Sequence, residues 1–162
     1  MPLHELSAIY SSPDPFHLRD GYMSKVIASI CHEYPEHDIV ALFHNLHIKK
    51  HGSREQGDLG LASVAEQLAA THRIGSRSIG LFATRGTARH NDLTLFDFAI
   101  TDPDVIETIH GVNSTGITQI TDPMLMADRT AYHHAFEKET LPVRIQYDEC
   151  VVFPRAHPPT QA

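Results

Sequence analysis

The sequence has few cysteines, no tryptophan and no long apolar run. Cys31 and Cys150 are too few for a disulfide-built secreted scaffold, and neither has a CxxC partner of the kind that binds zinc. No run of about 18 apolar residues exists that could span a membrane, and the N-terminus lacks the basic-then-apolar order of a signal peptide. We therefore expect a cytoplasmic protein with no membrane partner.

Basic residues are in the minority. The chain has 13 Lys and Arg against 20 Asp and Glu, a formal net charge of −7. Binding to phosphates needs a concentrated field of Lys and Arg, so we expect no nucleic-acid partner. Histidine is abundant, with 13 among 162 residues, and its charge changes near neutral pH.

The size and composition are those of one folded domain. The 18.1 kDa chain is 41% apolar and 20% charged, which is enough apolar material for a core. Residues 1–15 end in a cluster of turn formers and prolines, and we interpret them as a flexible lead-in. Residues 16–156 are expected to form a single domain, and residues 157–162 a Pro-rich tail.

Apolar spacing predicts the elements of the first half. Apolar residues at intervals of three and four from Leu18 predict a helix with one buried face, which Pro35 ends. The continuous apolar run at residues 39–43 is typical of an interior strand covered on both faces. A second helix is expected at residues 61–69 and a second buried strand at residues 79–83.

The second half continues this alternation. Asp102 and Pro103 form a helix start, as N-cap and first helical residue. The further expected elements are a strand at 93–100, a helix at 105–110, a strand at 117–121, a helical region at 123–138, and strands at 143–147 and 150–153. Helices that alternate with strands imply right-handed crossovers, so we predict an α/β fold whose mostly parallel sheet is flanked by helices.

Ligands of such sheets bind beyond the carboxyl ends of the strands. Two of these ends carry His44 with Asn45, and Arg85. His47 follows three residues after His44, so a helical turn would bring the two rings to one side. A neutral imidazole can act as general base or acid near pH 7, and an arginine can bind a carboxylate or an oxyanion.

Two other interpretations of the histidines stay open, and a neighbouring charge pair needs an interpretation of its own. The histidines can be ordinary structural or solvated side chains. Alternatively, His44, His47 and His51 can hold a transition metal, because imidazoles three residues apart can chelate, although no HExxH motif is present. Arg19 and Asp20, at the start of the first helix, are interpreted as a local charge pair.

Several motifs resemble the C-terminal part of the erythromycin esterase family, which is related to a heme-uptake and Tiki-like fold group. These motifs are Arg19-Asp20-x-x-Met23, His44-Asn45-x-His47-Ile48, Leu59-Gly60, Ala65-Glu66-Gln67-Leu68, Ser78-Ile79-Gly80-Leu81-Phe82 and the closing Cys150-Val151-Val152-Phe153-Pro154-Arg155-Ala156. The resemblance covers residues 19–98 and the last strand, and its most specific part is the HNxH element.

The resemblance implies hydrolysis of an ester or a macrolide lactone by an activated water, without a covalent serine. It places His44 and His47 in the catalytic site, in a polar cleft with Asn45 and Arg85 as substrate-binding residues. We expect no metal and no other cofactor. The family also uses an upstream Gly-Glu-x-x-His-Gly segment, which this sequence lacks.

The site is therefore expected to be incomplete in this chain. Its expected partners are a small ester substrate, a completing protein chain, or a second copy in a homo-oligomer. The alternative function is that of a non-catalytic binding or interaction protein that retains the scaffold, and a weaker alternative is a histidine-based metal or heme site.

Overall fold

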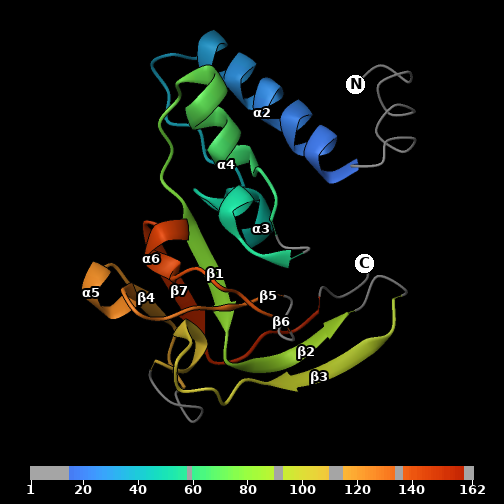
Figure 1. Cartoon of the computed structure of the whole chain (residues 1–162), viewed down its shortest axis with the longest axis vertical. Coiled ribbons are helices and arrows are strands. Elements are labelled where there is room, and N and C mark those ends of the chain that lie inside the picture. Colours follow the sequence, from blue (N-terminus) through green and yellow to red (C-terminus); the bar gives the residue numbers. More distant parts are fainter. Residues whose placement is uncertain (1–14, 58–59, 90–92, 110–114, 134–136, 159–162) are drawn as a thin grey trace. The chain divides into compact units, whose positions relative to one another are not determined.

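The computed structural model describes residues 15–57, 60–89, 93–109, 115–133 and 137–158. The chain divides into two compact units, one up to Ser78 and one from Ile79 onward, and each is described here by itself (Figure 1). The single domain expected at residues 16–156 stays a prediction. The expected lead-in and Pro-rich tail lie largely outside the described residues. None of the described helices is long and apolar enough to cross a membrane.

The described part of the first unit is helical. Its longest element, α2 (Pro15–Glu33), confirms the first predicted helix; it has proline at its first position and stops before Pro35. The shorter elements are α3 (Asn45–Ile48), the 3-10 turn η1 (Gly52–Arg54), α4 (Val64–Gln67) and the π-helical turn η3 (Leu68–His72). The last two correspond to the predicted second helix.

The buried face of α2 differs from the one that its apolar stripe predicted. Its fully buried residues are Asp20, Ser24 and Ala28, four residues apart. Small side chains at this spacing let α2 contact α4 and η3 closely. Large apolar residues elsewhere on the helix stay exposed: Leu18, Val26 and Ile30. The core consists of Ala28, Val64 and Leu68, with Met23, Ile27, Phe43 and Ile74 packed around it.

The predicted interior strand at residues 39–43 is wrong. This apolar segment has no regular secondary structure and lies at the surface, where Val40 is 94% exposed and Leu42 is 86% exposed. No hydrogen bond joins residues 39–42 to any other residue that the structure describes. A strand needs a neighbour to satisfy its backbone, and none of the described strands pairs with this segment.

The second unit contains a three-stranded sheet in the order β1-β7-β4. β1 (Ile79–Ala83) pairs in parallel with β7 (Glu149–Phe153), and β4 (Thr118–Ile120) pairs with β7 in the antiparallel direction. The strands predicted at 79–83, 117–121 and 150–153 are confirmed. The fold is α/β with a partly parallel sheet.

Two short antiparallel ribbons accompany this sheet. β2 (Arg85–Arg89) pairs with β3 (Leu95–Ala99), and β5 (Tyr132–His133) pairs with β6 (Glu137–Lys138). β3 confirms the strand predicted at 93–100. Gly86 in β2 lies against the backbone of Ala156, where an added Cβ would collide, so only glycine fits there.

Two helices expected in the second unit are much shorter than predicted. In place of a helix at 105–110 only the 3-10 turn η4 (Ile106–Thr108) forms, since the backbone of Val105 forms an isolated bridge with Thr130. Among the described residues of the helical region expected at 123–138, only α5 (Pro123–Met126) is helical.

The strand predicted at 143–147 is instead α6 (Val143–Gln146). Pro142 precedes it, and the Tyr147 N–H donates to the Val143 carbonyl at 2.8 Å, which closes one helical turn. The Tyr147 ring is buried edge-on against Phe82, with centroids 5.5 Å apart. One helical turn therefore places the Tyr147 ring in the core, and residues 143–147 do not have to form a strand to bury it.

Candidate functional site

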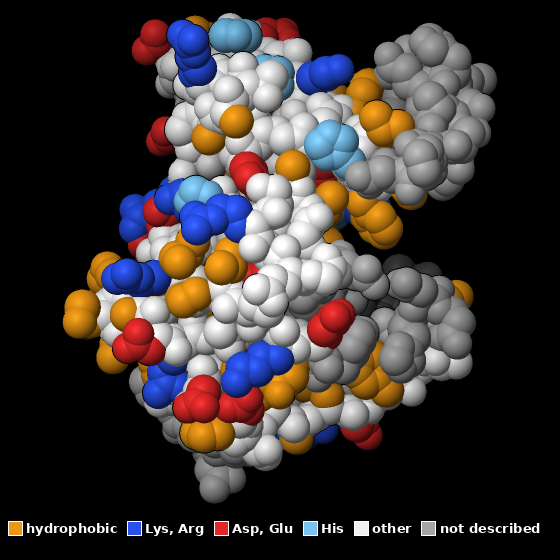
Figure 2. Space-filling view, viewed as in Figure 1, with side chains coloured by type: hydrophobic (Ala, Val, Ile, Leu, Met, Phe, Trp, Pro, Cys, Tyr) orange, Lys and Arg blue, Asp and Glu red, His pale blue; other side chains and the backbone are white. Residues whose placement is uncertain are grey.

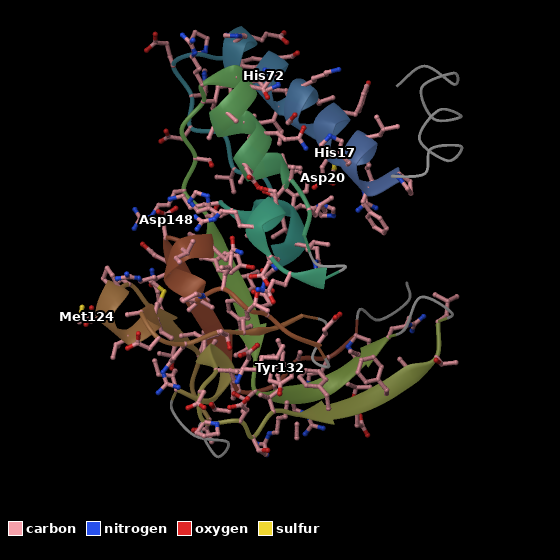
Figure 3. The ribbon with its side chains drawn as sticks, viewed as in Figure 1. His17, Asp20, His72, Met124, Tyr132 and Asp148 are labelled. Atoms are coloured by element: carbon pink, nitrogen blue, oxygen red, sulfur yellow. The ribbon has the colours of Figure 1, made fainter. Side chains whose placement is uncertain are left out.

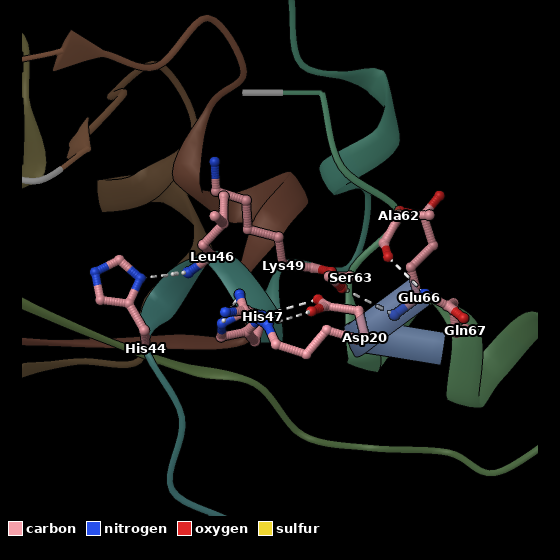
Figure 4. A network of polar contacts seen from close by, with 10 residues as sticks. Asp20, His44, Leu46, His47, Lys49, Ala62, Ser63, Glu66 and Gln67 are labelled. Atoms are coloured by element: carbon pink, nitrogen blue, oxygen red, sulfur yellow. Dashed lines mark hydrogen bonds and ion pairs between the residues drawn. The ribbon is translucent and has the colours of Figure 1, made fainter. Parts of the chain in front are cut away.

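A buried acid on α2 meets a histidine on α3. Asp20 is completely buried, and its Oδ2 lies 2.8 Å from Nδ1 of His47, a residue 27 positions later (Figure 4). The side chain of His47 is 13% exposed. A buried carboxylate without a partner would be costly, so the imidazole compensates for the burial of Asp20.

The partners of His47 define its tautomer. Arg19 places a terminal guanidinium nitrogen 3.1 Å from Nε2 of His47. Arginine has only donors, so Nε2 must accept, and an ionised Asp20 has only acceptors, so Nδ1 must carry the proton. In this arrangement His47 is a neutral imidazole whose basic nitrogen is Nε2.

Arg19 is held on three sides. Besides His47, its Nε lies 3.8 Å from Oδ1 of Asp20, and its guanidinium carbon lies 4.8 Å from the centroid of the Phe16 ring. Its side chain is nevertheless 42% exposed. Arg19 thus occupies the basic nitrogen of His47 with a long, partly exposed side chain, which can move away.

His44 has a structural role in the described geometry. It is the N-cap of α3, where its Nδ1 accepts a hydrogen bond from the Leu46 N–H at 3.2 Å. The other end of α3 is fixed by Ser63, whose hydroxyl donates to the Lys49 carbonyl and accepts from the Glu66 N–H at 3.1 Å (Figure 4). The one-turn helix that carries His47 is therefore fixed at both ends.

The remaining predicted site residues are distributed over both units. Asn45 is the first residue of α3 and is half-buried, and His51 is exposed just before η1. Arg85 is the first residue of β2 in the second unit, where it pairs with Ala99. No group of three or more His, Cys, Asp or Glu side chains arranged to hold a metal ion exists among the described residues.

Sequence reasoning missed the contact of Asp20 with His47. The expected local charge pair of Arg19 with Asp20 does form, but the shorter contact of Asp20 is with His47. A signal was present in the helix pattern, because Asp20, Ser24 and Ala28 share one helical face. An acid on the face of a helix that carries only small residues is a candidate for burial. Figure 3 labels Asp20 in the first half of α2.

The second unit buries a separate acidic group. Glu107 is 2% exposed, and its Oε1 accepts a hydrogen bond from the Tyr132 N–H at 2.8 Å. Burial raises the pKa of the Glu107 carboxyl to about 7, and nearby Glu139 adds to the rise. Burial, together with these two carboxyls, also raises the pKa of the Cys150 thiol to about 12.

Comparison with known proteins finds a solved structure of similar fold but no similar sequence. No family model and no curated protein matches the sequence. The structural likeness is to a histidine mutant of the erythromycin esterase EreC in its open conformation, with a TM-score of 0.64 and 17% identity. The match covers 95% of this chain but 41% of that chain. This chain thus has the fold of a part of an erythromycin esterase.

Proposed function

We propose that this chain carries the histidine part of a site that hydrolyses an ester or a lactone, with His47 as the general base. The contact between Asp20 and His47 carries the proposal. A buried carboxylate on Nδ1 holds the ring in one tautomer and stabilises the imidazolium that forms during proton transfer. The likeness in fold to an esterase supports the choice of an ester or a lactone as the substrate.

The proposed reaction needs no covalent intermediate. His47 Nε2 takes a proton from a water molecule as its oxygen attacks the ester carbonyl and forms a tetrahedral oxyanion. The intermediate collapses as the bond to the alcohol oxygen breaks, and the proton passes from Nε2 to that oxygen. The products are a carboxylic acid and an alcohol, or one hydroxy acid from a lactone.

Arg19 controls this step because it occupies the nitrogen that must act as the base. In the proposed complex the substrate draws the guanidinium away from Nε2, and its N–H groups then donate to the developing oxyanion. Its exposed fraction leaves it room to move. Asn45, next to the histidines, stays a predicted substrate-binding residue. The role predicted for Arg85 stays outside this proposal because Arg85 belongs to the second unit.

His44 is proposed to act through the helix that it caps. Loss of the cap would loosen α3 and displace His47 relative to Asp20. His44 is therefore a positioning residue in this account, and His47 is the base. The whole enzyme's substrates, macrolides included, remain proposals for this chain, since it spans less than half of the esterase that it matches.

A non-catalytic interaction protein is the second candidate function. The observation that favours it is the apolar segment at residues 39–43, which is largely exposed immediately before the histidines. Exposed apolar surface of this kind marks sites of protein contact. The two candidates differ in whether replacement of His47 changes a reaction rate.

A hydrolysis assay with small activated esters and a macrolactone tests the proposal. The variants are His47→Ala and Asp20→Asn, and the matched control is His32→Ala, an exposed histidine near the end of α2. This control matters because 13 histidines supply background hydrolysis of activated esters. We expect both site variants to lose about 10²-fold or more in kcat, and the control to keep the native rate. Equal rates in all proteins, or none in the native one, would refute the catalytic proposal.

A further inference from the structure

The apolar segment 39–43 has the composition of a buried strand, but it is largely exposed and pairs with no described strand. Val40 and Leu42 are almost fully exposed, whereas Ile39 is 39% exposed and Phe43 is half-buried against the core and the ring of His47. The side chains of Val40 and Leu42 thus point outward, and Ala41 between them is exposed as well. Five consecutive uncharged residues rich in β-branched and large apolar side chains have a high propensity for strand formation.

We propose that segment 39–43 is a dimerisation strand, which pairs in the antiparallel direction with the same segment of a second copy of this chain. An antiparallel pair of identical segments is symmetric about a two-fold axis, so both copies bury the same surface. Pairing satisfies backbone N–H and C=O groups for which the described residues supply no partner.

The flanking polar residues select the register of this pair. With Ala41 opposite Ala41 of the second copy, Val40 lies opposite Leu42 and Ile39 lies opposite Phe43, so each apolar residue meets an apolar one. The same register places the carboxylate of Asp38 opposite the imidazole of His44 at both ends, where an imidazole N–H can donate to the carboxylate. A shift of one residue would separate Asp38 from His44 and would set Ile39 opposite His44 or Asp38 opposite Phe43.

The same unit exposes further apolar surface that can enlarge the interface. Leu18, Val26 and Ile30 on α2 and Tyr34 just after it are between 36% and 47% exposed. Figure 2 shows hydrophobic side chains, in orange, at the surface of the molecule. A stable interface needs about 800 Å² from each partner, more than a five-residue strand alone provides, so we expect a dissociable dimer.

Two measurements on the full chain test the dimer. The first is sedimentation velocity over a concentration range up to about 100 μM, which covers the affinities expected of a small interface. The native protein is expected to shift from 18.1 kDa towards twice that mass. Leu42→Lys and Val40→Lys are expected to stay monomeric, with unchanged circular dichroism. A native protein that stays monomeric over the whole concentration range would overturn the proposal. The segment would then be expected to bind a different polypeptide.

The second measurement tests the register. In Ala41→Cys the two new thiols lie opposite each other, within the range of Cα separations that a disulfide accepts, so copper-phenanthroline oxidation is expected to give a covalent dimer. The matched control is Ser76→Cys, an exposed position after η3, and the native protein controls for Cys31 and Cys150. We expect at least 10-fold faster cross-linking at position 41. Equal rates at positions 41 and 76 would overturn the proposed register and with it this interface.

Discussion

Nδ1 of His47 lies 2.8 Å from Oδ2 of Asp20, and this contact joins the only buried acid of α2 to the one-turn helix α3. It explains why a carboxylate can be completely buried in the helical unit. It also gives His47 a defined orientation, with its basic nitrogen towards Arg19. The structural and the proposed catalytic roles of His47 thus depend on the same contact.

The first prediction tests whether His44 only positions His47 or itself takes part in the reaction. His44→Ala removes the side-chain acceptor at the N-cap of α3 and should lower stability by about 1 kcal/mol, with a fall in hydrolysis that follows from looser positioning of His47. Asparagine is an effective N-cap, so His44→Asn should keep most of the native stability and most of the native rate of hydrolysis. Thermal denaturation and ester hydrolysis measure the two effects. If His44→Asn were as inactive as His44→Ala, the imidazole of His44 would itself take part in the reaction.

The second prediction concerns the support of α3. Ser63 is completely buried, and its hydroxyl joins the Lys49 carbonyl to the first turn of α4. Ser63→Ala removes both hydrogen bonds and should cost roughly 1–3 kcal/mol of unfolding free energy in urea denaturation. The control is Ser29→Ala, whose hydroxyl makes one exposed hydrogen bond within α2. Equal losses in the two variants would contradict the role given to Ser63.

The third prediction is a pH dependence in the second unit. Burial raises the pKa of the Glu107 carboxyl from its ordinary value of 4.5 to about 7, so the folded state binds the proton more tightly than the unfolded state. The stabilising effect of that proton is complete below pH 4.5 and is lost as the pH rises through 7, with a slope of at most about 1.4 kcal/mol per pH unit.

Glu107→Gln tests this dependence because the amide stays neutral and can still accept from the Tyr132 N–H. Urea denaturation between about pH 5 and pH 8 should show a flatter profile for Glu107→Gln than for the native chain. Glu137→Gln, on the exposed strand β6, should keep the native profile. Parallel profiles for Glu107→Gln and the native protein would contradict the assignment.

The fourth prediction concerns the two thiols. Cys150 is fully buried, its pKa is raised to about 12, and its Sγ lies 3.5 Å from the sulfur of Met126. Cys31 is partly exposed on α2. Since the thiolate is the reactive form, iodoacetamide near pH 8 should modify Cys31 alone in the native protein and both thiols after denaturation. Mass spectrometry counts the adducts, and rapid native labelling of Cys150 would be the contrary result.

Local sequence signals predicted several elements well. α2 and the parallel strands β1 and β7 follow from apolar spacing, from Pro35 and from continuous apolar runs. Such signals succeed where tertiary contacts reinforce the local preference. They failed at residues 39–43, where strand propensity is high but no described strand pairs with the segment, and at α6, where one helical turn places the ring of Tyr147 in the core.

The candidate site was predictable only in part. The spacing of His44 and His47 marked the region, but spacing does not reveal that one ring caps a helix and the other meets a buried acid. That distinction depends on the packing of α2 against α4, which places Asp20 inside. Long-range contacts of this kind have no periodic signature in one sequence, so the role of Asp20 became visible only in three dimensions.

The central claim is that Asp20 and Arg19 hold His47 as a neutral imidazole protonated at Nδ1. Long-range ¹⁵N–¹H correlation spectra of the histidine rings distinguish the two neutral tautomers directly and need no substrate. We predict that the neutral ring of His47, assigned by its loss in His47→Ala, has a protonated Nδ1 and an unprotonated Nε2, and that Asp20→Asn disturbs this pattern. A ring protonated at Nε2, or a pattern unchanged in Asp20→Asn, would contradict the account.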